Sequence, residues 1–154
     1  MSQTGTSIKQ QKVDMKLEVD VIAVSDVERS KQFYQRLGWR LDADDAPAKD
    51  VRIVQFTPPG SGCSVTFGKG ITAAAPGSAE VALIVSDIEA ARDDLVGRGI
   101  DASEVWHGAS FPLEARVGGP DPKRTSYGSF CSFNDPDGNT WLVQEVTTRH
   151  PGRI

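Results

Sequence analysis

An internal repeat constrains the fold of this chain more than any other feature of its sequence. The run VSDVE at residues 24–28 returns as VSDIE at residues 85–89, which is 61 residues later. Gly38 returns at the same spacing as Gly99. Landmarks that keep their order and spacing are typical of a duplicated structural unit. At 154 residues, the chain has the length of one domain built from both copies, rather than of two independent domains.

The two copies differ in length in their second halves. The run GCSVTF at residues 62–67 corresponds to GNTWLV at residues 138–143, and here the offset is 76 residues instead of 61. The second copy is therefore about 15 residues longer. We place the additional residues in the Gly- and Pro-rich segment 108–126. A long loop of this kind is either a lid over a binding site or a surface excursion, and both readings stay open.

Each copy predicts the element order strand, helix, strand, strand, strand. Apolar and β-branched residues predict first strands at 17–24 and 81–85. The Ser-Asp-x-Glu run that follows each of them predicts a capping box, in which Ser25 and Ser86 cap the two helices. The later strands are predicted at residues 39–42, 51–57, 63–67, 101–107, 127–133 and 140–147. The sequence thus predicts an α+β fold of two tandem βαβββ modules.

Glycines and linkers set the boundaries of these modules. Gly38 and Gly99 are expected to end the helices in the left-handed backbone conformation that glycine tolerates. We expect a flexible N-terminal segment at residues 1–14 and a folded domain at residues 15–148. The modules within it span about residues 15–72 and 79–148.

The composition excludes several classes of partner. Seventeen Lys and Arg against 21 Asp and Glu give a net charge of −4, which leaves no basic excess for binding nucleic acid. No apolar run approaches the roughly 18 residues that a membrane span requires. The polar start of the chain lacks the apolar core of a signal peptide, so we expect a cytoplasmic protein. The two cysteines lie far apart and are expected to be small buried side chains.

The landmarks resemble the vicinal oxygen chelate superfamily, which includes glyoxalase I, bleomycin-resistance proteins, extradiol dioxygenases and fosfomycin-inactivating enzymes. The resemblance covers about residues 16–148. It rests on VSD at residues 24–26, FY at 33–34, LGW at 37–39, VSD at 85–87 and DPDGN at 135–139. It implies one open-barrel domain in which the concave faces of two sheets form a shared cavity. It also implies a homodimer, because cavities in this family are often completed across a two-fold axis.

The resemblance further implies four positions for metal ligands, usually His or Glu, on the first and last strands of the modules. In this chain those positions carry Val19, Thr66, Glu80 and Leu142. Two of these side chains are aliphatic and cannot donate to a metal, and one carboxylate with one neutral hydroxyl is a poor site. We therefore predict no cofactor and expect no divalent metal at this position.

Polar residues on the predicted strands are candidates for binding a small molecule. The candidates for ligand binding are Gln55, Thr66, Glu80, His107, Tyr127, Leu142 and Gln144. Glu80 and His107 are also candidates for catalysis, because a carboxylate or an imidazole in a cavity can serve as a base. Each has a plainer reading, as a solvated or hydrogen-bonded residue at a strand end. Trp141 is expected to pack under a helix and Glu145 to lie near solvent.

Three functional classes remain open from the sequence. The first is a small-molecule-binding protein of the glyoxalase and bleomycin-resistance type that lacks the four-ligand metal site. Val19 and Leu142 favour it, because they make a chelating centre apolar. The alternative is an enzyme of the same superfamily, either a metal-independent isomerase or epimerase or a metal-dependent lyase or dioxygenase. The third is a scaffold whose pocket has no ligand.

Overall fold

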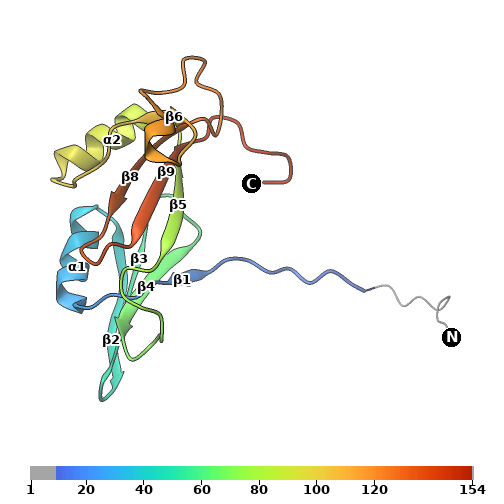
Figure 1. Ribbon diagram of the computed structural model, residues 1–154. Helices are drawn as coiled ribbons and strands as arrows, with labels where there is room; N and C mark the ends of the chain where they lie inside the picture. The colour runs from blue at the N-terminus through green and yellow to red at the C-terminus, as the bar shows by residue number, and fades with distance from the viewer. Residues whose placement is uncertain (1–9, 154) are drawn as a thin grey trace.

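The computed structural model describes residues 10–153, and its strands form two sheets that carry both helices on the same side (Figure 1). The first unit contains β1 (Val19–Val21), α1 (Val27–Arg36), β2 (Arg40–Ala48), β3 (Val51–Thr57) and β4 (Ser64–Lys69). The second contains β5 (Glu80–Val85), α2 (Ile88–Gly97), β6 (Trp106–Gly108), the short 3-10 helix η1 (Leu113–Ala115), β7 (Arg116–Gly118), β8 (Ser129–Asn134) and β9 (Thr140–Glu145). Most of the N-terminal segment expected at residues 1–14 lies outside the described residues.

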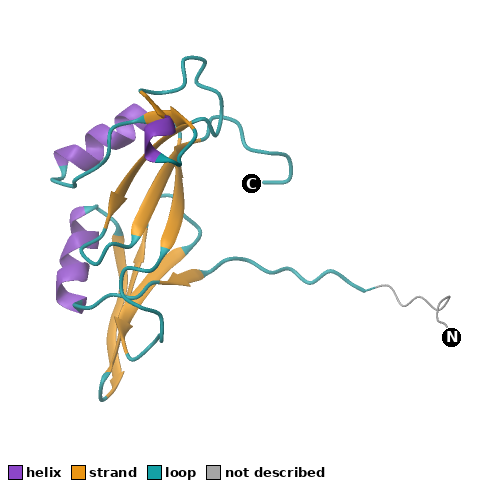
Figure 2. Cartoon of the chain, in the orientation of Figure 1, coloured by secondary structure: helices purple, strands orange, loops and turns teal. Residues whose placement is uncertain are grey.

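The two sheets have the same topology. The strand order is β1-β4-β3-β2 in the first and β5-β9-β8-β6-β7 in the second. In each unit the first strand is parallel to the last, and the other neighbouring strands are antiparallel. The tandem βαβββ fold is therefore confirmed, with open sheets (Figure 2). The inserted segment supplies β7 as an additional edge strand. No helix within residues 10–153 is long and apolar enough to cross a lipid bilayer.

Two predicted strands are much shorter than expected. The strand predicted at 17–24 reduces to β1. At its start, β4 begins at Ser64, whose N–H donates to the carbonyl of Glu18 at 2.8 Å, and beyond its end the carbonyl of Ala23 accepts from Asn139 instead of from β4. The strand predicted at 101–107 reduces to β6 and an isolated bridge between Ala102 and Phe133. Both predictions followed runs of strand-forming residues, but a strand extends only as far as its neighbour offers hydrogen bonds.

The helix caps differ from the predicted capping boxes by one residue. Asp26 Oδ1 accepts the N–H of Arg29 at 3.1 Å, and Asp87 Oδ1 accepts the N–H groups of Glu89 and Ala90, both at 3.1 Å. The prediction that Ser25 and Ser86 cap the helices is wrong. A carboxylate is the stronger acceptor at the positive end of a helix, which explains the choice of aspartate.

The hydrophobic core lies between the helices and the sheets. Both helices bury an apolar face, with Phe33 and Tyr34 from α1, Leu37 just after it, and Ile88 and Leu95 from α2. The sheets contribute Val54, Phe56, Val65, Phe67, Cys131, Phe133, Trp141 and Val143 to the same cluster. Trp141 packs in this core at 1% exposure, as expected. Gly38 and Gly99 adopt φ of 81° and 78°, the conformation expected after the helices.

A buried polar network joins the two units. The hydroxyl of Tyr34, in α1, donates to Asp135 Oδ2 at 2.8 Å and accepts the indole N–H of Trp141 at 3.0 Å. Burial, and then the nearby carboxylate of Asp135, raise the pKa of Tyr34 far above its ordinary value, so the hydroxyl keeps its proton. The helix of the first unit is thus bonded to the turn between β8 and β9 of the second.

Asn139 extends this network to the linker between the units. Its Nδ2 donates to the carbonyl of Ala23 at 2.9 Å and to Asp135 Oδ2 at 2.8 Å. Its Oδ1 accepts the N–H of Ala79 at 3.0 Å. Asp135 Oδ1 accepts the backbone N–H groups of Asp137 and Asn139, which holds the turn itself. The DPDGN motif therefore has a structural role, because it connects β1, the linker and β9.

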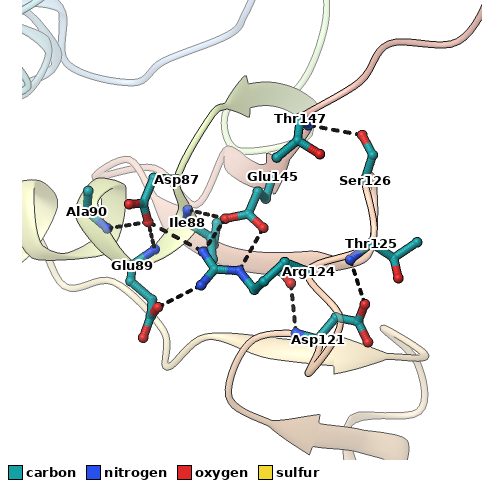
Figure 3. Close-up of polar contacts among 11 residues, drawn as sticks. Asp87, Ile88, Glu89, Ala90, Asp121, Arg124, Thr125, Ser126, Glu145 and Thr147 are labelled. Carbon is teal, nitrogen blue, oxygen red and sulfur yellow. Dashed lines mark hydrogen bonds and ion pairs between the residues drawn. The ribbon is translucent and has the colours of Figure 1, made fainter.

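A second polar cluster anchors the inserted segment to α2 (Figure 3). Arg124 contacts both oxygens of Glu145, at 2.9 and 2.5 Å, and reaches Glu89 at 2.9 Å. Glu145 also accepts the N–H of Ile88 at 2.9 Å. Glu145 is 1% exposed, so the expectation that it lies near solvent is wrong. Arg124, which has no counterpart in the first unit, is what allows this carboxylate to be buried.

We expect Tyr34→Phe to lower the free energy of unfolding by about 2 kcal/mol, because Asp135 loses a buried donor and Trp141 loses its acceptor. Tyr127→Phe is the matched control, since its hydroxyl accepts the N–H of His150 at an exposed position. The control should change stability by less than about 0.5 kcal/mol. Urea denaturation measures both. Equal losses of stability in Tyr34→Phe and Tyr127→Phe would show that the buried network around Tyr34 does not stabilise the fold.

A pH series tests the anchor at Glu145. The guanidinium of Arg124 holds the pKa of Glu145 below its usual range, and burial opposes this only in part. The stabilisation is therefore present above the ordinary carboxyl pKa and is lost as the pH falls through the lower folded-state value. We expect Glu145→Gln to cost about 1 kcal/mol near pH 7, allowing for the partial exposure of Arg124.

The stability difference between this variant and the wild type should narrow below about pH 4 in thermal melts. Glu104→Gln is the control, because Glu104 is 89% exposed in its pair with Arg92. A stability difference between Glu145→Gln and the wild type that stays constant with pH would contradict a stabilising ion pair between Glu145 and Arg124.

Candidate functional site

A pocket of about 190 Å³ lies on the second sheet, on the face opposite α2. Side chains alternate between the two faces of a strand, so Trp141 and Val143 of β9 face the core while Thr140 and Leu142 face the pocket. The residues that define the site are Glu80, Ala82, Trp106, Phe111, Arg116 and Leu142. All of them belong to the second unit.

Strand register builds the floor of this pocket. Leu142 lies at the centre of the floor, paired with Ala82 of β5 on one side and with Ser132 of β8 on the other. Residues that are paired across neighbouring strands point to the same face. The floor is therefore a largely apolar surface of small and medium-sized side chains, with room above it.

Aromatic side chains form one wall of the pocket. Trp106 of β6 stacks on Phe130 of β8 with ring centroids 5.5 Å apart and an interplanar angle of 22°. The guanidinium of Arg116 lies 3.7 Å from the centre of the Trp106 ring and 5.6 Å from that of Phe111. Arg116 is held there by donating to the carbonyl of Ser110 at 2.9 Å. Arg116 thus covers the exposed face of an aromatic platform.

The indole N–H of Trp106 has no hydrogen-bond partner among residues 10–153, although the side chain is only 3% exposed. Buried donors of this kind are rare in folded proteins and are normally satisfied by protein, water or ligand. Beside it, Arg116 carries a positive charge and Glu80, exposed at the start of β5, carries a negative one. The pocket therefore combines an apolar floor with one guanidinium and one carboxylate, and the buried indole of Trp106 stands in its wall.

The inserted segment shapes the pocket. Phe111 and Arg116 come from it, β7 pairs with β6, and Arg124 fixes its far end to Glu145. Phe111 is 73% exposed, so it stands at the entrance. Phe111 and Arg116 thus bring two side chains of this segment into the lining of the pocket.

The candidate residues predicted from the sequence lie in four places. Glu80 and Leu142 line the pocket together. Gln55 and Thr66 lie side by side on the first sheet, where the Thr66 hydroxyl donates to Gln55 Oε1 at 3.4 Å. These two pairs are on different sheets, and the pocket described here contains only the first.

The remaining three candidates lie outside this pocket. Gln144 Nε2 donates to the carbonyl of Tyr127 at 2.9 Å, and the ring of Tyr127 stacks on His150 with centroids 4.1 Å apart. His107 follows Trp106 on β6 and therefore points to the other face, where its Nδ1 lies 2.8 Å from the carbonyl of Gly119. The two catalytic candidates, Glu80 and His107, are not brought together.

Sequence reasoning missed Trp106, Phe111 and Arg116. Trp106 lies directly beside His107, and strand alternation means that only one of the two can face the pocket. Phe111 and Arg116 lie in a segment that has no counterpart in the first unit, so the repeat offered no guide to them. An aromatic residue and an arginine within a Gly- and Pro-rich loop were the available signal.

The four positions at which the family would bind a metal do not fit a divalent ion. Val19 and Thr66 lie on the first sheet, and Glu80 and Leu142 on the second. Valine and leucine offer no donor atom, and a lone carboxylate is insufficient. Within the described part of the chain, no three His, Cys, Asp or Glu side chains gather as a possible metal site.

Solved structures with this fold include an antibiotic-binding protein from Streptomyces sp. CB03234. It is 26% identical with a TM-score of 0.65, over 88% of this chain and 99% of that one. A glyoxalase/bleomycin resistance protein from the same organism is also 26% identical, with a TM-score of 0.62 over 84% and 100% of the two chains.

A third solved structure is a member of the glyoxalase/bleomycin resistance protein/dioxygenase superfamily from Sphaerobacter thermophilus. It is 26% identical with a TM-score of 0.63, over 86% of this chain and 98% of that one. No curated protein shows a significant match. The family model described as Glyoxalase/Bleomycin resistance protein/Dioxygenase superfamily matches residues 16–143. Because that match covers most of the chain and agrees with the duplicated topology, the protein belongs to the glyoxalase/bleomycin resistance protein/dioxygenase superfamily.

Proposed function

We propose that this protein binds a small, largely apolar organic molecule in the pocket of its second unit, without a metal ion at the position usual for the family. The observation that carries the proposal is the buried indole of Trp106, whose N–H is unpaired among the described residues and whose ring lies between Phe130 and the side chain of Arg116. A ligand that displaces Arg116 could stack its aromatic part on this ring, or could accept the N–H, which points outward in the ring plane, through a polar group at its edge.

The dimensions of the pocket restrict how a ligand enters. Pockets that hold drug-sized molecules usually measure about 300–1,000 Å³, more than the volume present here. A ligand of that size requires Arg116 or Phe111 to swing aside, and both belong to the inserted segment. Phe111 is exposed and can turn outward at little cost, which opens the pocket above Leu142. One relative is described as an antibiotic-binding protein, and this supports binding as the function.

A metal-independent isomerase or epimerase is the second candidate. Glu80 and Arg116 line the same pocket, so a carboxylate base would face a guanidinium able to hold a substrate oxygen. Such a pair could remove a proton from a carbon next to a carbonyl group. His107 does not support this reaction, because it lies on the other face of the sheet. A metal-dependent lyase or dioxygenase is less favoured, since the donor set is poor.

We further propose that the protein works in the cytoplasm as a homodimer, without nucleic-acid or membrane partners. The net charge of −4 supports the exclusion of nucleic acid, because the chain has no excess of basic residues to bind phosphates. The homodimer is proposed from the family resemblance.

We expect a panel of aromatic antibiotics, bleomycin included, to contain a compound that raises the melting temperature of the protein and binds saturably in calorimetry. Trp106→Ala should weaken that binding by about tenfold or more, because stacking and a hydrogen bond are both lost. Gln55→Ala, on the other sheet, is the control and should leave affinity unchanged. Equal affinity of Trp106→Ala and the wild type for the compound would show that the compound binds at another site.

We expect metal-stripped protein to take up no stoichiometric Zn²⁺, Ni²⁺ or Mn²⁺ in equilibrium dialysis with elemental analysis. The antibiotic affinity should also be unchanged by EDTA. Glu80→Gln removes the carboxylate among the four family positions and should behave like the wild type in this assay. One bound ion per chain that disappears in Glu80→Gln would contradict the metal-independent site.

A further inference from the structure

The segment before β1 has the pattern of a strand but pairs with no strand among residues 10–153. We define the arm as residues 12–18, in which Val13, Met15 and Leu17 alternate with charged residues. These three apolar side chains are 73%, 89% and 79% exposed. Strict alternation of apolar and charged residues is typical of a strand with one buried face. Figure 1 shows the arm running away from the body of the protein.

The arm continues a strand that is already paired along one edge. Glu18 and Ile22 direct their backbone groups toward β4, through the N–H of Ser64 at 2.8 Å and the carbonyl of Thr66 at 2.9 Å. Backbone groups alternate between the two edges of a strand, so Val13, Met15 and Leu17 direct theirs to the free edge. An exposed edge of this kind is a template for pairing with another chain.

The charges of the arm are complementary to those of a second copy of the arm that runs antiparallel to it. If two arms pair antiparallel with Met15 opposite Met15, Asp14 faces Lys16 of the second copy. In the same register, Lys12 faces Glu18 and Val13 faces Leu17. Every charged position therefore meets an opposite charge, and every apolar position meets an apolar one.

Neighbouring registers lack this complementarity. Centring the pair on Asp14 places Asp14 opposite itself and Lys12 opposite Lys16. Centring it on Lys16 places Asp14 opposite Glu18, and a parallel pair in register places every charge beside its own copy. Like charges directly opposite one another destabilise strand pairs. The sequence of the arm thus favours the Met15 register over these alternatives.

We propose that the arm binds the arm of a second copy of this chain as an antiparallel two-stranded ribbon centred on Met15. Pairing along the free edge puts Met15 in a hydrogen-bonded position, so the Asp14–Lys16 pairs fall in non-hydrogen-bonded positions, where side chains are closest. A ribbon alone is marginal in water. Its apolar face is continuous with Val19 and Val21, which are 38% and 50% exposed and add to the apolar surface that dimerisation covers.

This inference rests on the homodimer proposed above and is independent of ligand binding. The test is sedimentation equilibrium of the full chain over a range of concentrations. The wild type should be in monomer–dimer equilibrium. Asp14→Lys and Lys16→Asp each create two like-charge contacts across the two-fold axis, and each should raise the dissociation constant about tenfold or more. The double variant Asp14→Lys/Lys16→Asp should restore the affinity of the wild type.

Asp93→Lys is the control for net charge, because Asp93 is exposed on α2, and it should dimerise like the wild type. The variants should keep the melting temperature of the folded monomer, since Asp14 and Lys16 are exposed and lie outside the buried core cluster. Wild-type protein that stays monomeric at all concentrations would overturn both the ribbon and the homodimer. A dimer equally strong in both single variants would overturn the ribbon alone and leave a homodimer formed through another surface.

Discussion

The hydrogen bonds around Asp135 hold the two units of the repeat in one domain. The carboxylate accepts from Tyr34 of the first helix and from Asn139, which in turn binds the end of β1 and the linker. Buried charges are tolerated only where donors surround them, and here the donors come from both units. The relative placement of the two sheets, and hence the open face on which the pocket forms, depends on this arrangement.

The pocket itself arises from the asymmetry between the units. The first unit lacks an insertion, and its candidate polar residues, Gln55 and Thr66, bond to each other. The second unit carries the segment that brings Arg116 over Trp106 and is tied down through Arg124 and Glu145. Duplication thus supplies the scaffold with Glu80, Trp106 and Leu142, and the insertion adds Phe111 and Arg116 to the site. This division agrees with a fold that hosts many functions through local changes.

The repeat allowed most of the fold to be predicted, because each element of one copy had a twin to check it. The site was only partly predictable for the same reason: Glu80 and Leu142 occupy repeat-related positions, whereas Phe111 and Arg116 have no twin. Ser25 and Glu145 were misjudged because their side chains bond to partners distant in sequence, Ser25 to Asp137 and Glu145 to Arg124. Local sequence patterns identify a strand or a helix, but they do not show which carboxylate forms an ion pair with a distant arginine.

The indole N–H of Trp106 provides the most direct test of the central claim that this pocket binds a ligand. Two-dimensional ¹H–¹⁵N NMR resolves the side-chain signals of the three tryptophans. During titration with a bound antibiotic, the Trp106 signal should move saturably as its N–H gains an acceptor, while that of Trp141, already bonded to Tyr34, stays in place. A Trp106 signal that remains unchanged while the protein saturates with the compound would contradict the account.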